Sequence, residues 1–183
     1  MKKLPLDFTL ERYGLQVRLV EEEDAEFIVS LRTDPRLSKH LHATPSDIEQ
    51  QKQWIRDYKL REEQGLDYYF LFSIHGQPQG LARIYDITED TFTQGSWIFS
   101  PEAALGASVL GNIISSEIGF DFLEKKVEYS DARRDNKTHR YVQSFNPEII
   151  KTDELNIYYK ILPEGFKQGV KKHVALCMKV MQK

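Results

Sequence analysis

Residues 97–123, WIFSPEAALGASVLGNIISSEIGFDFL, set the pattern from which the rest of the chain is interpreted. Trp97–Phe99 is an apolar strand end. Ser100–Glu102 breaks it, because proline fixes its backbone φ and lacks a main-chain donor. Apolar residues then recur at helical spacing and form one face about four turns long. These residues are Val109, Ile113, Ile114, Ile118, Phe122 and Leu123.

Gly106 lies where this predicted helix begins. The first amides of a helix have no partner within it, and they carry the positive end of the helix dipole. A strand that runs into a small-residue turn and then a helix N-terminus is therefore suited to an anion such as a pyrophosphate. The alternative for this stretch is an ordinary buried helix that follows a strand.

The composition is that of a soluble globular protein of ordinary size. The 183 residues carry a net charge of −3, so no overall positive field indicates a nucleic acid or an anionic membrane as a partner. Apolar runs fall short of the roughly 20 residues of a membrane span, and the first residues lack the apolar core of a signal peptide. The histidines and the single Cys177 match no metal-binding pattern. We expect a cytoplasmic protein without a metal.

The N-terminal part of the chain predicts a strand followed by two helices. Leu15–Val20 alternates in polarity, as a strand does. Asp24 is the expected N-cap of a helix over Ala25–Arg32, and Ser46 the expected N-cap of a helix that ends near Gln64. The second helix has a partial apolar stripe of Ile48, Trp54, Ile55, Tyr58 and Leu60.

The middle of the chain predicts strands. Tyr68–His75 and Gly80–Ile87 form a hairpin around a turn signal that contains Gly76. Thr91–Phe99 is the long strand that leads into the turn described above, and Lys126–Asp131 is the strand after the long helix.

The C-terminal part predicts one more strand, Glu154–Leu162, and then a helix that Pro163 opens at its first turn. A strand is the alternative for the last segment, because HVALCMKV is also compatible with β structure. The apolar face of the helix packs either on the sheet or on a second subunit, so the protein is a monomer or a homodimer. Residues of this face recur at helical spacing: Phe166, Val170, Val174, Cys177 and Met181.

The alternation of strands and helices predicts an α/β or α+β fold with a mixed sheet. We expect residues 1–183 to form a single domain, in which residues 163–183 are a C-terminal amphipathic segment.

The stretch around Gly106 resembles motif A of the GNAT superfamily of N-acetyltransferases, whose pyrophosphate loop reads Q/R-x-x-G-x-G/A. Gly106 matches the central glycine and Ser108 the last small residue, whereas Ala103 departs from the motif. The order of elements over residues 13–162 is also similar to that family. The resemblance implies a mixed, mostly antiparallel sheet flanked by helices, with acetyl-CoA bound where the fourth and fifth strands part. It assigns to the coenzyme Trp97, Ile98, Phe99, Leu105, Gly106, Ala107, Ser108 and Val109.

Residues 132–146 resemble the family's motif B, and DARRDN places Asn136 at the position that commonly helps to hold the coenzyme. Relatives often carry a Tyr or His about seven residues further on, which protonates the leaving thiolate. That position is Gln143 or Val142 here, and neither is an acid. Tyr141 is the preferred acid and His139 the second choice; a core aromatic is the alternative for Tyr141.

Three basic residues and one amide are the candidates for contact with the acceptor. The LRTDPRL segment resembles one found in the branch that acetylates nucleotide-linked amino sugars, and Arg32 is carried over as a contact to sugar or phosphate. The alternative for Arg32 is a solvated charge at the end of a helix. His42 and Arg83 are further candidates, with a surface position and cross-strand packing as their alternatives. Gln94 stands where many relatives carry a Glu, so it positions water or substrate but is not a base.

The resemblance implies an acyl-CoA-dependent N-acetyltransferase whose acceptor amine attacks the thioester directly. A small metabolite, first of all a nucleotide-linked amino sugar, is the expected substrate. The alternatives are a protein N-terminal amine as acceptor, or a GNAT-shaped CoA-binding or structural module impaired in catalysis.

Overall fold

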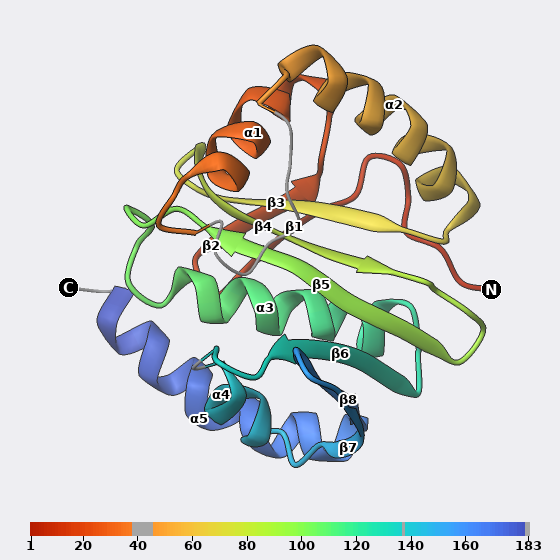
Figure 1. Ribbon diagram of the computed structural model, residues 1–183, viewed down its shortest axis with the longest axis vertical. Helices are drawn as coiled ribbons and strands as arrows, with labels where there is room; N and C mark the ends of the chain where they lie inside the picture. Colours follow the sequence, from red (N-terminus) through yellow and green to blue (C-terminus); the bar gives the residue numbers. More distant parts are fainter. Residues whose placement is uncertain (38–45, 137, 182–183) are drawn as a thin grey trace.

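The computed structural model describes residues 1–37, 46–136 and 138–181 (Figure 1). One eight-stranded sheet has the order β1-β2-β3-β4-β5-β6-β8-β7, and every neighbouring pair is antiparallel except β5–β6. The strands are β1 Thr9–Arg12, β2 Leu15–Leu19, β3 Tyr68–Ile74, β4 Gln77–Tyr85, β5 Thr91–Phe99, β6 Val127–Arg133, β7 Glu148–Thr152 and β8 Asn156–Ile161. The helices are α1 Ala25–Thr33, α2 Ile48–Gln64, α3 Ala107–Glu117, α4 His139–Gln143 and α5 Pro163–Met181.

Helices cover both faces of the sheet, α1 and α2 on one side and α3 and α5 on the other (Figure 1). Each face has its own apolar core, and β3 contributes to both. Its residues Tyr68–Phe72 are all buried, with Phe70 on the α3 side and Leu71 on the α1 side. A continuous apolar run of this kind is typical of a strand that is covered on both faces.

The long helix predicted after Gly106 is confirmed, and a π-helical turn, Ile118–Phe122, extends it. Every residue of α3 from Leu110 to Glu117 is buried. The outer side of α3 is covered by α5, which runs antiparallel to it (Figure 1): Phe166 lies 5.2 Å from Phe120 between ring centroids, and Cys177 lies against Gly106. The C-terminal helix is therefore confirmed, and its β alternative is wrong.

Two strands were not predicted, β1 and β7. β1 pairs with β2 through a two-residue turn at Tyr13 and Gly14, both of which have positive φ. His75 and Gly76 make the same kind of turn in the predicted β3–β4 hairpin. Such turns match the twist of the flanking strands.

Some predicted helix details are wrong. Asp47, and not Ser46, caps α2, because its carboxylate accepts from the amide of Gln50. Leu60 is 59% exposed, whereas the polar Glu62 of the same helix is buried and accepts hydrogen bonds from Tyr58 and Lys59.

Asp24 does lie at the N-cap position of α1, but its side chain does not cap that helix. Its carboxylate instead forms an ion pair with Arg18 and accepts from the amide of Glu21.

None of the described helices combines the length and the apolar character needed to cross a membrane.

Candidate functional site

The two strands at the centre of the sheet diverge. β5 and β6 are paired only through Thr91–Thr93 and Val127–Tyr129, after which the two strands diverge in the shape of a V (Figure 1). The predicted separation of these strands is therefore confirmed. Beyond the last pair, the edge of β5 from Gln94 to Phe99 is not paired with β6.

A β-bulge distorts β5 within the part of the strand that has separated from β6. Ala82 of β4 is opposed by two residues, Ser96 and Trp97, and Ser96 has a φ of +48°. Bulges of this kind redirect side chains and interrupt strand pairing, and they are frequent beside active sites. Here the bulge turns Trp97 toward α3, where its indole Nε1 donates to the carbonyl of Ser108 at 2.9 Å.

The loop between β5 and α3 presents main-chain donors. Gly106 is the N-cap of α3 with a φ of +96°, and the first amide to bond back into the helix is that of Leu110. Within the described residues, the amides of Leu105, Gly106, Ser108 and Val109 donate no main-chain hydrogen bond. These are free donors at the positive end of the helix dipole, as an anion requires.

Gly106 is required for a second reason, because α5 passes directly over it. A Cβ at this position would lie 3.1 Å from the Cβ of Cys177 and 3.3 Å from a methyl carbon of Val180. Any side chain here would push α5 away from the start of α3. The turn and the covering helix thus both depend on the one glycine of the predicted motif.

The other residues assigned to the coenzyme fall into two groups. The side chains of Ile98, Phe99 and Ala107 are buried in the two cores, so only their main-chain groups face outward. Leu105 is 74% exposed at the loop. Asn136 lies just before α4 and accepts from the amide of Thr138 at 3.1 Å, which shapes the start of that short helix.

Tyr141 lies beside the V, and His139 points away from it. The Tyr141 ring is 5.5 Å from that of Trp97, and its hydroxyl donates to Asn112 Oδ1 at 2.7 Å. Burial raises the pKa of Tyr141 well above its usual value, and the charges of Glu128 and Cys177 add to this effect. His139 Nδ1 instead pairs with the hydroxyl of Tyr159 on β8 at 2.8 Å.

Gln94 is buried on the α3 side of the sheet. Its amide donates to the carbonyl of Asn112 at 2.9 Å and lies 3.3 Å from Ser116 Oγ, and its oxygen accepts from Asn112 Nδ2 at 2.8 Å. These bonds attach α3 to β5, and through Asn112 they hold the hydroxyl of Tyr141. The predicted contact of Gln94 with an acceptor has no support in this position.

Arg83 and Arg32 converge on the opposite face of the sheet. Arg83 Nε donates to Asp67 Oδ1 at 2.7 Å, and its guanidinium lies over the rings of Trp54 and Tyr85. Burial raises the pKa of Tyr69, and the charge of Arg32 opposes this shift, which places Arg32 beside the Tyr69 hydroxyl. His42 lies outside the described residues.

Tyr85, which shares a face of its strand with Arg83, lies on this same side of the sheet near the closed end of the V. Asp131, which the sequence analysis did not single out, lies there as well. A Cβ on Gly95 would touch the Tyr85 ring at 3.0 Å, so Tyr85 lies across β5. Burial raises the pKa of Tyr85, and the charge of Asp131 on β6 is the next cause. Alternation along β6 puts Asp131 on the face opposite to Glu128.

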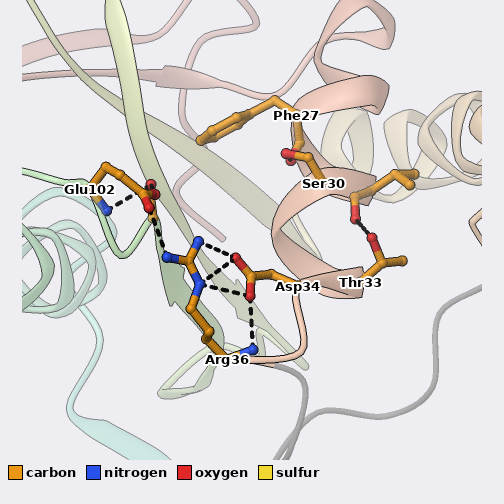
Figure 2. A network of polar contacts seen from close by, with 8 residues as sticks. Phe27, Ser30, Thr33, Asp34, Arg36 and Glu102 are labelled. Carbon is orange, nitrogen blue, oxygen red and sulfur yellow. Dashed lines mark hydrogen bonds and ion pairs between the residues drawn. The ribbon is translucent and has the colours of Figure 1, made fainter.

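Arg36 connects the segment after α1 to the loop between β5 and α3 (Figure 2). Arg36 pairs with Asp34 and donates to Glu102 Oε1 at 2.8 Å. Figure 2 shows Arg36 between the two carboxylates, one from each segment. Arg36 and Glu102 are both exposed to solvent, so we expect their ion pair to contribute little to stability.

Comparisons with known proteins agree with this geometry. The sequence model of the acetyltransferase (GNAT) domain matches residues 15–116. A solved structure described as apo FdhC, a nucleotide-linked sugar GNAT, is 32% identical, with a TM-score of 0.81 over 91% of this chain and 97% of that one. No curated protein matches the sequence.

Two more distant structures share the fold alone. One is the ribosomal-protein-S5-alanine acetyltransferase from Vibrio fischeri, 15% identical, with a TM-score of 0.66 over 85% of this chain and 97% of that one. The other is RimJ from Mycobacterium smegmatis in complex with CoA-disulfide, 12% identical, with a TM-score of 0.71 over 92% of this chain and 91% of that one.

Proposed function

This chain belongs to the GNAT family of acetyltransferases, and on that premise we propose that it transfers the acetyl group of acetyl-CoA to a primary amine of a small metabolite. The first candidate for the acceptor is an amino sugar linked to a nucleotide. The structure that is 32% identical is described as a nucleotide-linked sugar GNAT, and that description supports this choice.

The observation that carries the proposal is the combination of the V with the loop at Gly106. Free main-chain amides at the start of α3 suit a pyrophosphate, and the edge of β5 offers main-chain groups to an extended amide-containing arm. Both features open on the same side of β5, so one coenzyme reaches both. The departure at Ala103 leaves these main-chain donors intact.

The chain's own residues have distinct roles in the proposed reaction. Acetyl-CoA supplies an activated acyl group, which a neutral amine attacks. A main-chain amide of β5 near the bulge stabilises the oxyanion. Tyr141 is assigned as the donor toward the sulfur because its ring lies beside Trp97 of β5; its one hydroxyl proton, directed to Asn112 Oδ1 in this structure, would turn to the sulfur when the coenzyme is bound. Asp131 is the base that receives the amine proton, since it lies on the acceptor face.

The acceptor is proposed to bind on the face that carries Arg32, Arg83 and Tyr85. Arg83 forms an ion pair with Asp67, and the Asp67 carboxylate partly neutralises the positive charge that Arg83 could offer to a ligand. Arg32 on the same face is a second cation of the kind that suits the diphosphate of a sugar nucleotide.

The test is calorimetric titration with acetyl-CoA of the natural protein and of two variants, Gly106→Trp and Gly76→Trp. Gly76 is a matched control, because it also has a positive φ but lies in a hairpin turn with no atom within 4 Å of an added Cβ. We expect micromolar binding that is lost only in Gly106→Trp. Release of the CoA thiol with a panel of nucleotide-linked amino sugars then tests transfer.

Binding without any transfer would identify a CoA-binding module instead of an enzyme acting on these amines. Absence of binding would contradict the proposed coenzyme site. Within an active protein, Asp131→Asn is expected to lower turnover at least tenfold while the affinity for acetyl-CoA stays the same.

A further inference from the structure

The short helix that carries Tyr141 has little packing of its own. α4 has five residues, and none of them is buried. Isolated helices of this length do not form in water, so neighbouring elements set the position of α4. One of these neighbours is α5, to which neither the coenzyme nor the acceptor has been assigned.

α5 meets the end of α4 with a row of three residues. Gly165, Gly169 and His173 are spaced four residues apart, so they follow one another along one side of the helix. The apolar pattern of the sequence does not include them. Their contacts show what this side of α5 does.

The two glycines let the main chain after α4 approach the backbone of α5. A Cβ on Gly165 would overlap the carbonyl oxygen of Phe145. A Cβ on Gly169 would lie 2.6 Å from the carbonyl oxygen of Ser144 and 2.6 Å from a ring carbon of Phe145. Because protein interiors are close-packed, a side chain at either position requires Ser144 and Phe145 to move.

His173, the next residue of the row, contacts α4 at two points. Its ring centroid lies 5.0 Å from that of Tyr141, and its Nε2 lies 2.7 Å from Ser144 Oγ. Ser144 Oγ also donates to the carbonyl of Tyr141 at 2.6 Å. A hydroxyl has a single proton, so the Ser144 oxygen that gives this proton to Tyr141 accepts one from His173 Nε2.

His173 is one of three rings that pack against Tyr141. The other two are Trp97 of β5, with ring centroids 5.5 Å apart, and Phe145, at 5.0 Å. These contacts restrict the Tyr141 ring, whereas its hydroxyl hydrogen still rotates about the carbon–oxygen bond. The proton can therefore turn from Asn112 toward a coenzyme sulfur without movement of the ring.

We propose that His173 is a positioning residue for acetyl transfer, which holds the end of α4 and the ring of Tyr141 so that the tyrosine hydroxyl reaches the sulfur of the coenzyme. This inference rests on the proposed function and extends its site to the C-terminal helix. A displacement of about 1 Å in such an arrangement can lower a rate on the order of 100-fold.

The first measurement compares His173→Gln with His173→Leu in acetyl transfer from acetyl-CoA to the best nucleotide-linked amino sugar of the panel. His173→Leu is expected to lose at least tenfold in kcat, with an unchanged KM for acetyl-CoA. His173→Gln should stay within threefold of the natural kcat, because its side-chain amide still offers a donor to Ser144. If His173 only filled space among the rings, leucine would be the better replacement, and that order would overturn the inference.

A double-mutant cycle tests whether His173 acts through Tyr141. Tyr141→Phe removes the hydroxyl, so adding His173→Leu to it should lower kcat no further. Losses that multiply in the double variant would overturn the inference, since His173 would then act on another step.

Gly169→Ala tests the same contact from the backbone of α5. Alanine favours a helix more than glycine does, so the substitution does not weaken α5 itself. We expect a loss of at least tenfold in kcat, because Ser144 and Phe145 must move. Gln168→Ala, at the exposed neighbouring position, is the matched control and should keep the natural kcat. A natural kcat in Gly169→Ala would contradict the contact, and if this variant does not fold, the two His173 variants decide.

The two levels of failure are distinguishable. If the natural protein transfers acetyl groups and His173→Leu does so with the same kcat, this inference alone is wrong. If the natural protein transfers no acetyl group to any amine of the panel, the proposed function fails, and the role of His173 is overturned with it.

Discussion

Single residues at this site carry more than one constraint each. Gly106 combines a positive φ with the close passage of α5, so a side chain at this position opposes both the turn and the packing. Gln94 binds α3 through a pair of amide hydrogen bonds to Asn112, and Asn112 in turn fixes Tyr141. Residue type alone does not reveal such a chain of contacts.

Glu128 makes stability depend on pH in a defined direction. Burial raises its pKa in the folded protein from 4.5 to about 7, so the folded state keeps a proton that the unfolded chain releases. The stability that results is complete below pH 4.5 and is lost as the pH rises to about 7. A shift of this size corresponds to about 3 kcal/mol in total, of which about 2–3 kcal/mol is lost between pH 5 and pH 8. Glu128→Gln is expected to remove this loss.

Chemical unfolding of both proteins at pH 5 and pH 8 measures the difference. Glu128→Gln should gain about 2–3 kcal/mol relative to the natural protein between the two values. Glu154→Gln, at an exposed position, is the control and should follow the natural protein. Parallel curves for all three proteins would show that Glu128 is not buried as described.

At the scale of elements, helices with a regular apolar face were predicted well, and exposed strands were not. The period of α3 and α5 is visible in the sequence because one side of each is buried. β7 has no alternation to detect, since all five of its residues are exposed, and β1 is only half-buried. Leu60 and Glu62 reverse the expected polarity of α2, because Glu62 has buried partners in Tyr58 and Lys59.

The residues of the candidate site also differ in how far the sequence reveals them, because some belong to local motifs and others depend on contacts between distant strands. The loop at Gly106 and Tyr141 could be proposed as parts of the site from the sequence because they belong to local motifs. The position of Asp131 beside the V depends on which strands are neighbours and where β5 and β6 part, which the sequence does not reveal. The bulge at Ser96, which changes the side to which Trp97 points, has no signal in the sequence.

The attachment of α5 gives a prediction for this helix. Phe166 is 3% exposed and packs on Phe120 and Phe145, with ring centroids 5.2 Å and 5.3 Å away. We expect Phe166→Ala to lower the free energy of unfolding by about 3–5 kcal/mol, because it leaves a cavity among aromatic rings. Leu176→Ala on the same helix, at a side chain that is 60% exposed, should stay within about 0.5 kcal/mol.

Urea denaturation of the two variants and the natural protein measures these changes in the free energy of unfolding. Equal losses for Phe166→Ala and Leu176→Ala would mean that α5 does not dock on α3 through the face described. A loss confined to Phe166→Ala would support the docking.

At the scale of the whole molecule, the sheet has two parts, β1–β5 and β6–β8, joined by three residue pairs. The proposed coenzyme site lies where these two parts diverge and not on either one alone. α3 follows the first part, and α5 returns from the second part to cover α3 (Figure 1). A ligand in the V therefore contacts both parts of the sheet.

Hydrogen exchange tests this arrangement across the chain. Saturating acetyl-CoA is expected to slow exchange several-fold in peptides that cover Gln94–Phe99 and Leu105–Val109, because bound ligand occupies their main-chain groups. The peptide over β7 is the internal control and should not change. Equal protection in β7, or none in β5, would contradict the proposed position of the coenzyme.

The covering of α3 by α5 also fixes an order of events during synthesis. Residues 163–181 begin to leave the ribosome about 45 residues after the end of α3, which amounts to several seconds at typical elongation rates of roughly 5–20 residues per second. During that interval the strands of the first part are complete, but the outer side of α3 and the glycine at its start are uncovered. A nascent chain interrupted in this interval therefore exposes an apolar helix face. We expect chaperones and proteases to recognise the chain first at this face of α3.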